Sequence, residues 1–120
     1  YTQGDVTEFA RLLTGWSVAQ RAEPFGTIFR RHAHEPGAKR VLGRPFEEGP
    51  EAAEAALRFL AAQPATHRHL AVKLARHFVA DDPPPAAIRA IEAALRDSDG
   101  DLGAAARALL SAQRVAIVAG

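Results

Sequence analysis

The chain has 120 residues, of which 48% are hydrophobic, so it is long enough to bury a core of its own. Fifteen basic and fourteen acidic residues leave a formal net charge of +1, which is no overall signature of nucleic-acid or membrane-surface binding. The absence of cysteine excludes disulfides, thiol nucleophiles and cysteine-based metal sites. No apolar run reaches the ~20 residues of a membrane helix, and no signal peptide is visible.

Residues 3–14 are predicted to form the first helix. Thr2, followed three residues later by Asp5, resembles the capping box that begins many helices, with Asp in place of Glu. Gly15 is a natural stop. Apolar residues follow at helical spacing, at Val6, Phe9, Ala10, Leu13 and Trp16.

The helical spacing then disappears over residues 17–49, where glycine and proline recur. Two short runs in this segment, Thr27–His32 and Lys39–Leu42, are able to pair as a small hairpin. Pro36 and Gly37 between them suit the central positions of a type II turn. The alternative is a long irregular loop that covers the helices.

Helical spacing returns from residue 50 to the end of the chain. We expect helices over residues 50–62 and 65–80, with Pro64 in the first turn of the second one. Asp82 is predicted to cap a helix that begins at Pro83 and runs to about residue 97.

A fifth helix is expected after Gly100, which is able to take the left-handed position that ends a helix, with Asp101 as the new cap. The apolar run Val115–Val118 closes the chain. The sequence therefore predicts an all-α fold of about five helices in a compact bundle, with a small β-hairpin or long loop between the first two. We expect one domain over residues 1–120, with residues 17–49 as an insert.

His32, His34 and Glu35 are the first candidates for chemistry. On a strand, residues two apart face the same side, so both imidazoles are able to bind one metal ion, with Glu35 as a third ligand or a base. A single H-x-H pair is common by chance, and we favour two polar histidines on an exposed hairpin. We therefore expect no metal and no cofactor.

A local excess of positive charge lies over residues 30–44, where five basic residues oppose only Glu35. Such a segment is able to bind an anionic partner, such as a phosphate group or an acidic protein surface. The alternative, which we favour, is a solvated charged loop. The basic residues are Arg30, Arg31, Lys39, Arg40 and Arg44.

Several short motifs occur in this order along nearly the whole chain: Tyr1–Val6, Leu13–Trp16, His34–Lys39, Leu42-Gly43, Pro64–Thr66, Lys73–Val79, Asp82–Pro84 and Gly100–Leu102. Together they resemble the DUF1800 family of bacterial proteins of unknown function. The resemblance implies a largely helical fragment from the C-terminal part of a protein several hundred residues long, and an exported parent protein. It supplies no agreed catalytic residues.

Three functional hypotheses remain open. The first is a structural or interaction domain that supports the remainder of the parent chain, or binds a separate protein. The second is part of an enzyme, such as a hydrolase, whose site is shared with another region and uses His34, Glu35 or Lys39. Helix packing does not explain His34 and Lys39, so these two are the preferred functional positions. The third is an anion-binding module that uses the basic segment 30–44.

Overall fold

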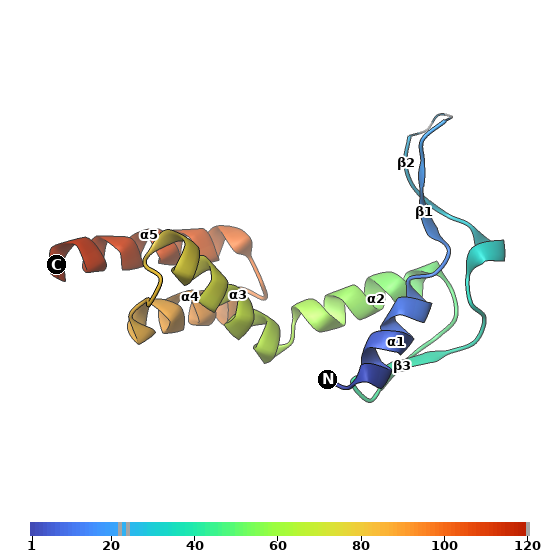
Figure 1. The fold of residues 1–120 in the computed structure, drawn as a ribbon, viewed down its shortest axis with the longest axis horizontal. Coiled ribbons are helices and arrows are strands. Elements are labelled where there is room, and N and C mark those ends of the chain that lie inside the picture. The colour runs from blue at the N-terminus through green and yellow to red at the C-terminus, as the bar shows by residue number, and fades with distance from the viewer. Residues whose placement is uncertain (22, 24, 120) are drawn as a thin grey trace. The chain divides into compact units, whose positions relative to one another are not determined.

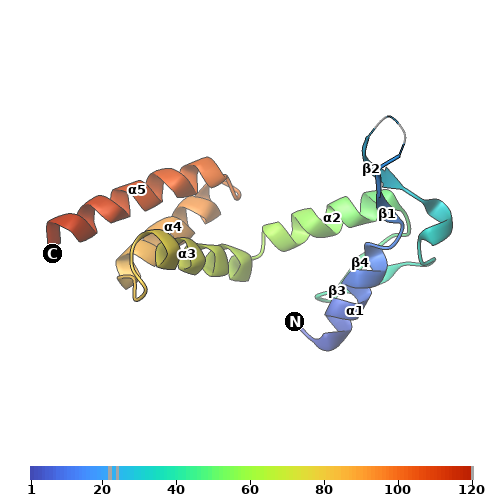
Figure 2. The same ribbon diagram turned by 45° about the horizontal axis from the view of Figure 1, so that its top comes forward.

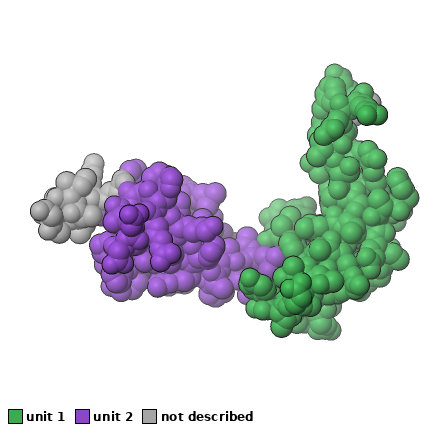
Figure 3. Space-filling view, viewed as in Figure 1, with its two compact units in different colours: residues 1–58 green, residues 59–120 purple. Residues whose placement is uncertain are grey.

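The structure, a computed structural model, describes residues 1–119 except Ala22 and Pro24, and describes side chains only as far as residue 112. The described residues form two compact units, Tyr1–Arg58 and Phe59–Gly120 (Figure 3). The organisation as one domain stays a prediction. No helix in the described part is both long and apolar enough to cross a membrane.

The elements follow one another as helices and short strands (Figures 1 and 2). The helices predominate, and α2 contains the boundary between the two units. In chain order the elements are α1 (Gln3–Leu12), β1 (Trp16–Ala19), β2 (Gly26–Phe29), the 3₁₀ turn η1 (Arg31–Ala33), β3 (Lys39–Val41), β4 (Arg44–Phe46), α2 (Pro50–Ala61), α3 (Pro64–Phe78), α4 (Pro85–Asp97) and α5 (Leu102–Ala119).

The all-α prediction is wrong, because two antiparallel hairpins accompany the helices. Strand β1 pairs with β2, with Trp16 opposite Phe29, and strand β3 pairs with β4, with Lys39 opposite Phe46. The two runs that we expected to pair with each other thus belong to different hairpins. Strands β3 and β4 are joined by only two residues, Leu42 and Gly43, which is a shorter loop than residues 33–38 between the runs that we expected to pair.

The turn between β3 and β4 explains why the second hairpin forms. Its two central residues, Leu42 and Gly43, have φ angles of 48° and 76°. Positive φ at both positions is the requirement of the two-residue turn that best matches strand twist. Leu-Gly is an unusual sequence for such a turn, so the usual Asn-Gly signal of a hairpin was absent.

The start of α1 confirms the capping prediction. The Thr2 hydroxyl accepts a hydrogen bond from the Asp5 N–H at 3.2 Å, and the Asp5 carboxylate accepts from the Thr2 N–H at 2.7 Å. The helix ends at Leu12, and Gly15 has a φ of 89°. Only glycine adopts this φ angle without strain.

The helix α3 begins with Pro64, as expected, but α4 begins later than expected. Its N-cap is Pro84 and its first residue is Pro85, so Asp82 does not cap it. A residue that precedes proline is driven towards extended backbone, so the helix is unable to begin until the last proline of the run. The start of α5 is as predicted, because Asp101 Oδ1 accepts the Gly103 N–H at 2.9 Å.

The core of the second unit lies between α3, α4 and α5. Ile91 and Leu95 of α4 are almost completely buried, and small alanines of α3 and α5 allow the helices to approach them. Phe78, which continues the apolar stripe of α3, is half exposed. The side chains of Val115–Val118 lie outside the described residues. The buried cluster consists of Ala71, Ala75, Ile91, Leu95, Ala105 and Leu109.

The first unit buries residues from α1, the β3–β4 hairpin and the start of α2. The β1–β2 hairpin projects away from these elements (Figure 1), and we call it the arm. Trp16, Val18 and Phe25 of the arm and its loop are 38%, 59% and 65% exposed. The buried residues of this unit are Leu12, Val41, Phe46, Ala52, Ala53, Ala56 and the charged Lys39.

Candidate functional site

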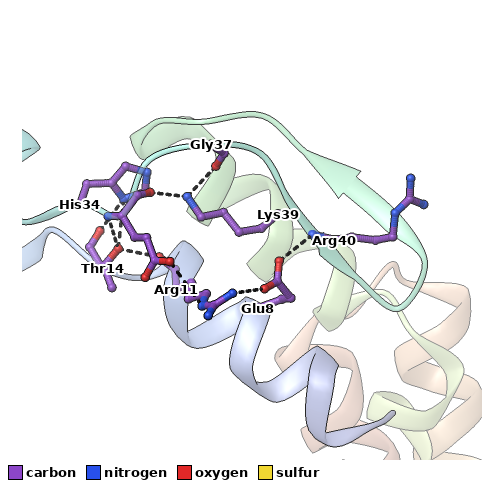
Figure 4. A network of polar contacts seen from close by, with 8 residues as sticks. Glu8, Arg11, Thr14, His34, Gly37, Lys39 and Arg40 are labelled. Atoms are coloured by element: carbon purple, nitrogen blue, oxygen red, sulfur yellow. Dashed lines mark hydrogen bonds and ion pairs between the residues drawn. The ribbon is translucent and has the colours of Figure 1, made fainter.

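The loop that joins η1 to β3 carries the preferred functional positions, and it lies against the C-terminal end of α1 (Figure 4). His34 Nδ1 lies 2.8 Å from the carbonyl oxygen of Thr14. A carbonyl only accepts, so Nδ1 carries the proton and donates it, which leaves the lone pair of a neutral ring on Nε2. Nε2 is buried and has no hydrogen-bond partner among the described residues.

Thr14 connects the end of α1 to this loop through its hydroxyl group. The hydroxyl donates to the carbonyl oxygen of Arg11 at 2.5 Å and accepts the N–H of Glu35 at 2.8 Å. Together with the bond from His34, these contacts hold residues 34 and 35 against a segment 20 residues earlier. The loop belongs to neither β-hairpin, and these side-chain hydrogen bonds anchor it instead.

Lys39 is buried, with 5% of its surface exposed, although it carries a charge. Its ammonium group donates to the carbonyl oxygens of Glu35 and Gly37, the latter at 2.6 Å. A buried charge is tolerated only where hydrogen bonds replace its lost hydration. The ammonium group of Lys39 thus closes the loop upon itself and is not directed at solvent.

The carboxylate of Glu35 is about half exposed and forms an ion pair with Arg11 Nε at 3.4 Å. Arg11 also contacts Glu8 at 2.9 Å. Exposed ion pairs of this kind contribute about 0–1 kcal/mol each. The structure therefore brings His34, Glu35 and Lys39 into one loop, but each of the three has a contact within the fold.

Two carboxylates extend this network along the β3–β4 hairpin. Glu48 Oε2 accepts the Gly37 N–H at 2.6 Å, and Asp5 Oδ1 accepts the Leu42 N–H at 2.8 Å. The hydrogen bonds from the backbone N–H groups of Thr2 and then Leu42 lower the pKa of Asp5 below 3.8. Asp5 thereby connects the cap of α1 to the turn between β3 and β4.

Gly15 lies where the arm leaves α1, and a larger residue does not fit there. A Cβ atom at this position would lie 2.9 Å from Phe29 Cε2, and 3.0 Å from both the Arg30 carbonyl oxygen and His34 Cβ. The Arg30 N–H donates to the Gly15 carbonyl oxygen at 2.7 Å. The two strands of the arm are therefore closed at their base by a tightly packed glycine.

The predicted anion-binding residues do not form one cluster. Lys39 points into the fold, whereas Arg40, its neighbour on β3, points the opposite way (Figure 4) and donates to the Gly43 carbonyl oxygen. The Arg44 guanidinium lies 5.3 Å from the centre of the Phe46 ring. Arg30 and Arg31 are exposed, and the described residues offer their side chains no hydrogen bond or ion pair.

The candidate metal ligands are separated by the geometry of the 3₁₀ turn. His32 lies within η1 and is exposed, whereas His34 follows the turn and its Nδ1 is occupied by Thr14. Within the described part of the chain, no three His, Asp or Glu side chains lie close enough together to hold a metal ion.

Sequence reasoning did not identify Thr14 as part of this site. Its hydroxyl makes two hydrogen bonds and also lies 3.3 Å from His34 Nδ1, yet a threonine at the end of a helix carries no specific signal. Thr14 does lie within Leu13–Trp16, one of the motifs that resemble the family. That motif was the only indication in the sequence that this position matters.

No curated protein and no solved structure matches this chain. A family model described as "Protein of unknown function (DUF1800)" matches residues 1–118, which is nearly the whole chain. The matched region includes the anchored loop, the arm, helices α1 to α4 and all of α5 except its last residue. The chain therefore belongs to the DUF1800 family.

Proposed function

We propose that the chain is a structural and interaction domain that binds the remainder of a longer parent chain, with the arm as a main contact. The single observation that carries this proposal is the Lys39 ammonium group, which is buried and bonded to two backbone carbonyls. The polar residue that sequence reasoning selected for chemistry thus supports the fold.

The exposed surface of the arm supports the same proposal. Val18 and Phe25 are each more than half exposed, and Trp16 is more than one third exposed. A two-stranded hairpin is only marginally stable by itself in water and normally packs against another element. Exposed apolar side chains on such a hairpin are typical of a surface that binds another protein segment.

Calorimetric titration of the 120-residue chain with the remainder of its parent, produced as a separate polypeptide, tests this proposal. We expect binding, and we expect the double variant Val18→Asp/Phe25→Asp to weaken it by about tenfold or more. Leu57→Asp is the matched control, because Leu57 is 52% exposed and belongs to α2, not to the arm. The proposal fails if the parent remainder does not bind, or if both variants lose the same affinity.

One observation favours the second hypothesis, an enzyme site shared with another region. His34 Nε2 is buried and lacks a partner among the described residues, although its lone pair is able to accept a proton. A residue from elsewhere in the parent chain would complete this contact. Retained parent activity on any substrate after His34→Ala removes this alternative, whereas a loss without unfolding supports it.

A further inference from the structure

The outer edge of β2 is an unpaired strand edge. The Arg30 N–H donates to the Gly15 carbonyl oxygen at 2.7 Å, so these two residues form a hydrogen-bonded pair at the base of the arm. In an antiparallel ladder such pairs alternate with pairs whose N–H and C=O groups point outwards. The next pair is Trp16 with Phe29, and two residues further along lies Val18 with Thr27.

This alternation directs the backbone groups of Thr27 and Phe29 away from β1. Outside the β1–β2 ladder, the described residues make no backbone hydrogen bond to these groups. Proteins usually protect such edges with proline, lysine, a bulge or a covering segment. Within the described part of the chain, none of these protects β2, whose residues are Gly26, Thr27, Ile28 and Phe29.

The end of this edge is positively charged. Arg30 and Arg31 follow β2 directly, are exposed, and have no acidic partner among the described residues. Glu35, the nearest acidic residue in the sequence, is paired with Arg11. The edge therefore has two recognition elements: unpaired backbone groups along the strand, and two unpaired guanidinium groups at its end.

The base of the arm holds this edge in a fixed position. Phe29 contacts Trp16 with ring centres 5.5 Å apart, and it contacts the His34 ring at 5.3 Å. His34 is in turn bonded to Thr14. Phe29, the last residue of β2, is packed between Trp16 and His34. Little conformational entropy is therefore lost when another strand pairs with this edge.

We propose that the β2 edge binds an extended peptide segment as a third strand, with acidic side chains of that segment on Arg30 and Arg31. This inference rests on the proposed function as an interaction domain, and it specifies an extended acidic peptide as the class of partner. Main-chain hydrogen bonds to Thr27 and Phe29 supply affinity, and alternate apolar residues of the peptide extend the face of Trp16 and Phe29. The acidic residues set its register.

A nucleic acid is the less suitable occupant. Affinity for a nucleic acid depends on neutralising many phosphates, whereas this chain has a net charge of +1. An open strand edge, by contrast, matches the backbone of an extended peptide and not a sugar–phosphate chain.

Selection of displayed random peptides of about 12 residues on the immobilised 120-residue chain tests the proposal. We expect selected peptides to alternate apolar residues and to carry Asp or Glu at one end. The Kd of a selected synthetic peptide is then measured with the variants Thr27→Pro and Thr27→Val. Proline removes the outward N–H without removing a bond between β1 and β2, whereas valine keeps that N–H.

Thr27→Pro is expected to weaken peptide binding by about tenfold or more, and Thr27→Val to change it by less than about threefold. Arg30→Glu/Arg31→Glu is expected to weaken it to a similar extent. Its control is Arg76→Glu/Arg89→Glu, which makes the same charge change on exposed arginines of α3 and α4. A peptide with N-methyl groups on alternate amides is expected not to bind the unaltered chain, which tests the edge without any variant.

The proposal is overturned by selected peptides without acidic residues, by equal affinity for Thr27→Pro and Thr27→Val, or by tighter binding of oligothymidylate through Arg30 and Arg31. Dimers of the chain that Thr27→Pro dissociates would also overturn it, because a second copy would then occupy the edge. If the parent remainder binds the unaltered chain and Thr27→Pro equally, the β2-edge proposal fails but the proposed function stands. If it does not bind the unaltered chain, the proposed function fails.

Discussion

His34 Nδ1 lies 2.8 Å from the carbonyl oxygen of Thr14, and this contact joins the base of the arm to the end of α1. It gives His34 a structural role. The same loop uses the hydroxyl of Thr14 and the ammonium of Lys39 for backbone hydrogen bonds. The polar residues of the family motif thus hold a projecting hairpin in place.

Gly15→Ala is expected to destabilise the first unit by about 1–3 kcal/mol, because a Cβ atom adds crowding to an unfavourable φ angle. Gly37→Ala is the matched control. Its φ is 87° against 89° for Gly15, but nothing lies within 4 Å of its Cβ position. Urea unfolding measures both variants, and an equal loss of free energy would show that the contacts with Phe29 and His34 do not matter.

Thr14→Val is expected to speed hydrogen exchange of the Arg30 and Glu35 amides, because the hydroxyl that accepts the Glu35 N–H is lost. Valine keeps the shape of threonine, so packing changes little. Thr7→Val is the control, since the Thr7 hydroxyl bonds only to the Gln3 carbonyl within its own helix. Unchanged exchange in Thr14→Val, measured by NMR, would contradict the anchoring role of Thr14.

Asp5 is expected to give the chain a pH-dependent stability in acid. Its pKa is lowered in the folded state from 3.8, mainly by the N–H groups of Thr2 and Leu42. The unfolded state therefore binds a proton more readily. The contribution of Asp5 is present above pH 3.8 and is lost as pH falls through the lower folded pKa.

Asp5→Asn is therefore expected to lower the urea midpoint at neutral pH and to flatten its decline as the pH falls below 3.8. Asp81→Asn, at an exposed position without a hydrogen bond among those described, is the control and is expected to keep the decline. An equally steep decline in Asp5→Asn would contradict this account.

Local rules in the sequence predicted the helices well. The Thr2–Asp5 capping box, Pro64 at the start of α3 and Asp101 at the start of α5 each depend on residues within a few positions. The start of α4 was misplaced because the restriction that proline imposes on its predecessor outweighs the capping preference of Asp82. The resemblance also predicted the family correctly.

The strands and the network were harder to predict, because they depend on contacts between distant residues. Trp16 continued the spacing of the first helix, yet Gly15 turns the chain and places Trp16 in β1. Lys39 was interpreted as functional because helix packing did not explain it. Its actual partners are backbone carbonyls of its own loop, and no side-chain pattern reports them.

Urea unfolding of Lys39→Met, compared with Lys73→Met, tests the central claim most directly. Lys39 is buried and bonded to two carbonyls, whereas Lys73 is exposed on α3. Methionine keeps the length of the side chain but leaves those carbonyls unpaired. The account predicts a loss of about 1–3 kcal/mol for Lys39→Met and about 0.5 kcal/mol or less for Lys73→Met. Equal and small losses would contradict it, because Lys39 would then be free for chemistry and not required by the fold.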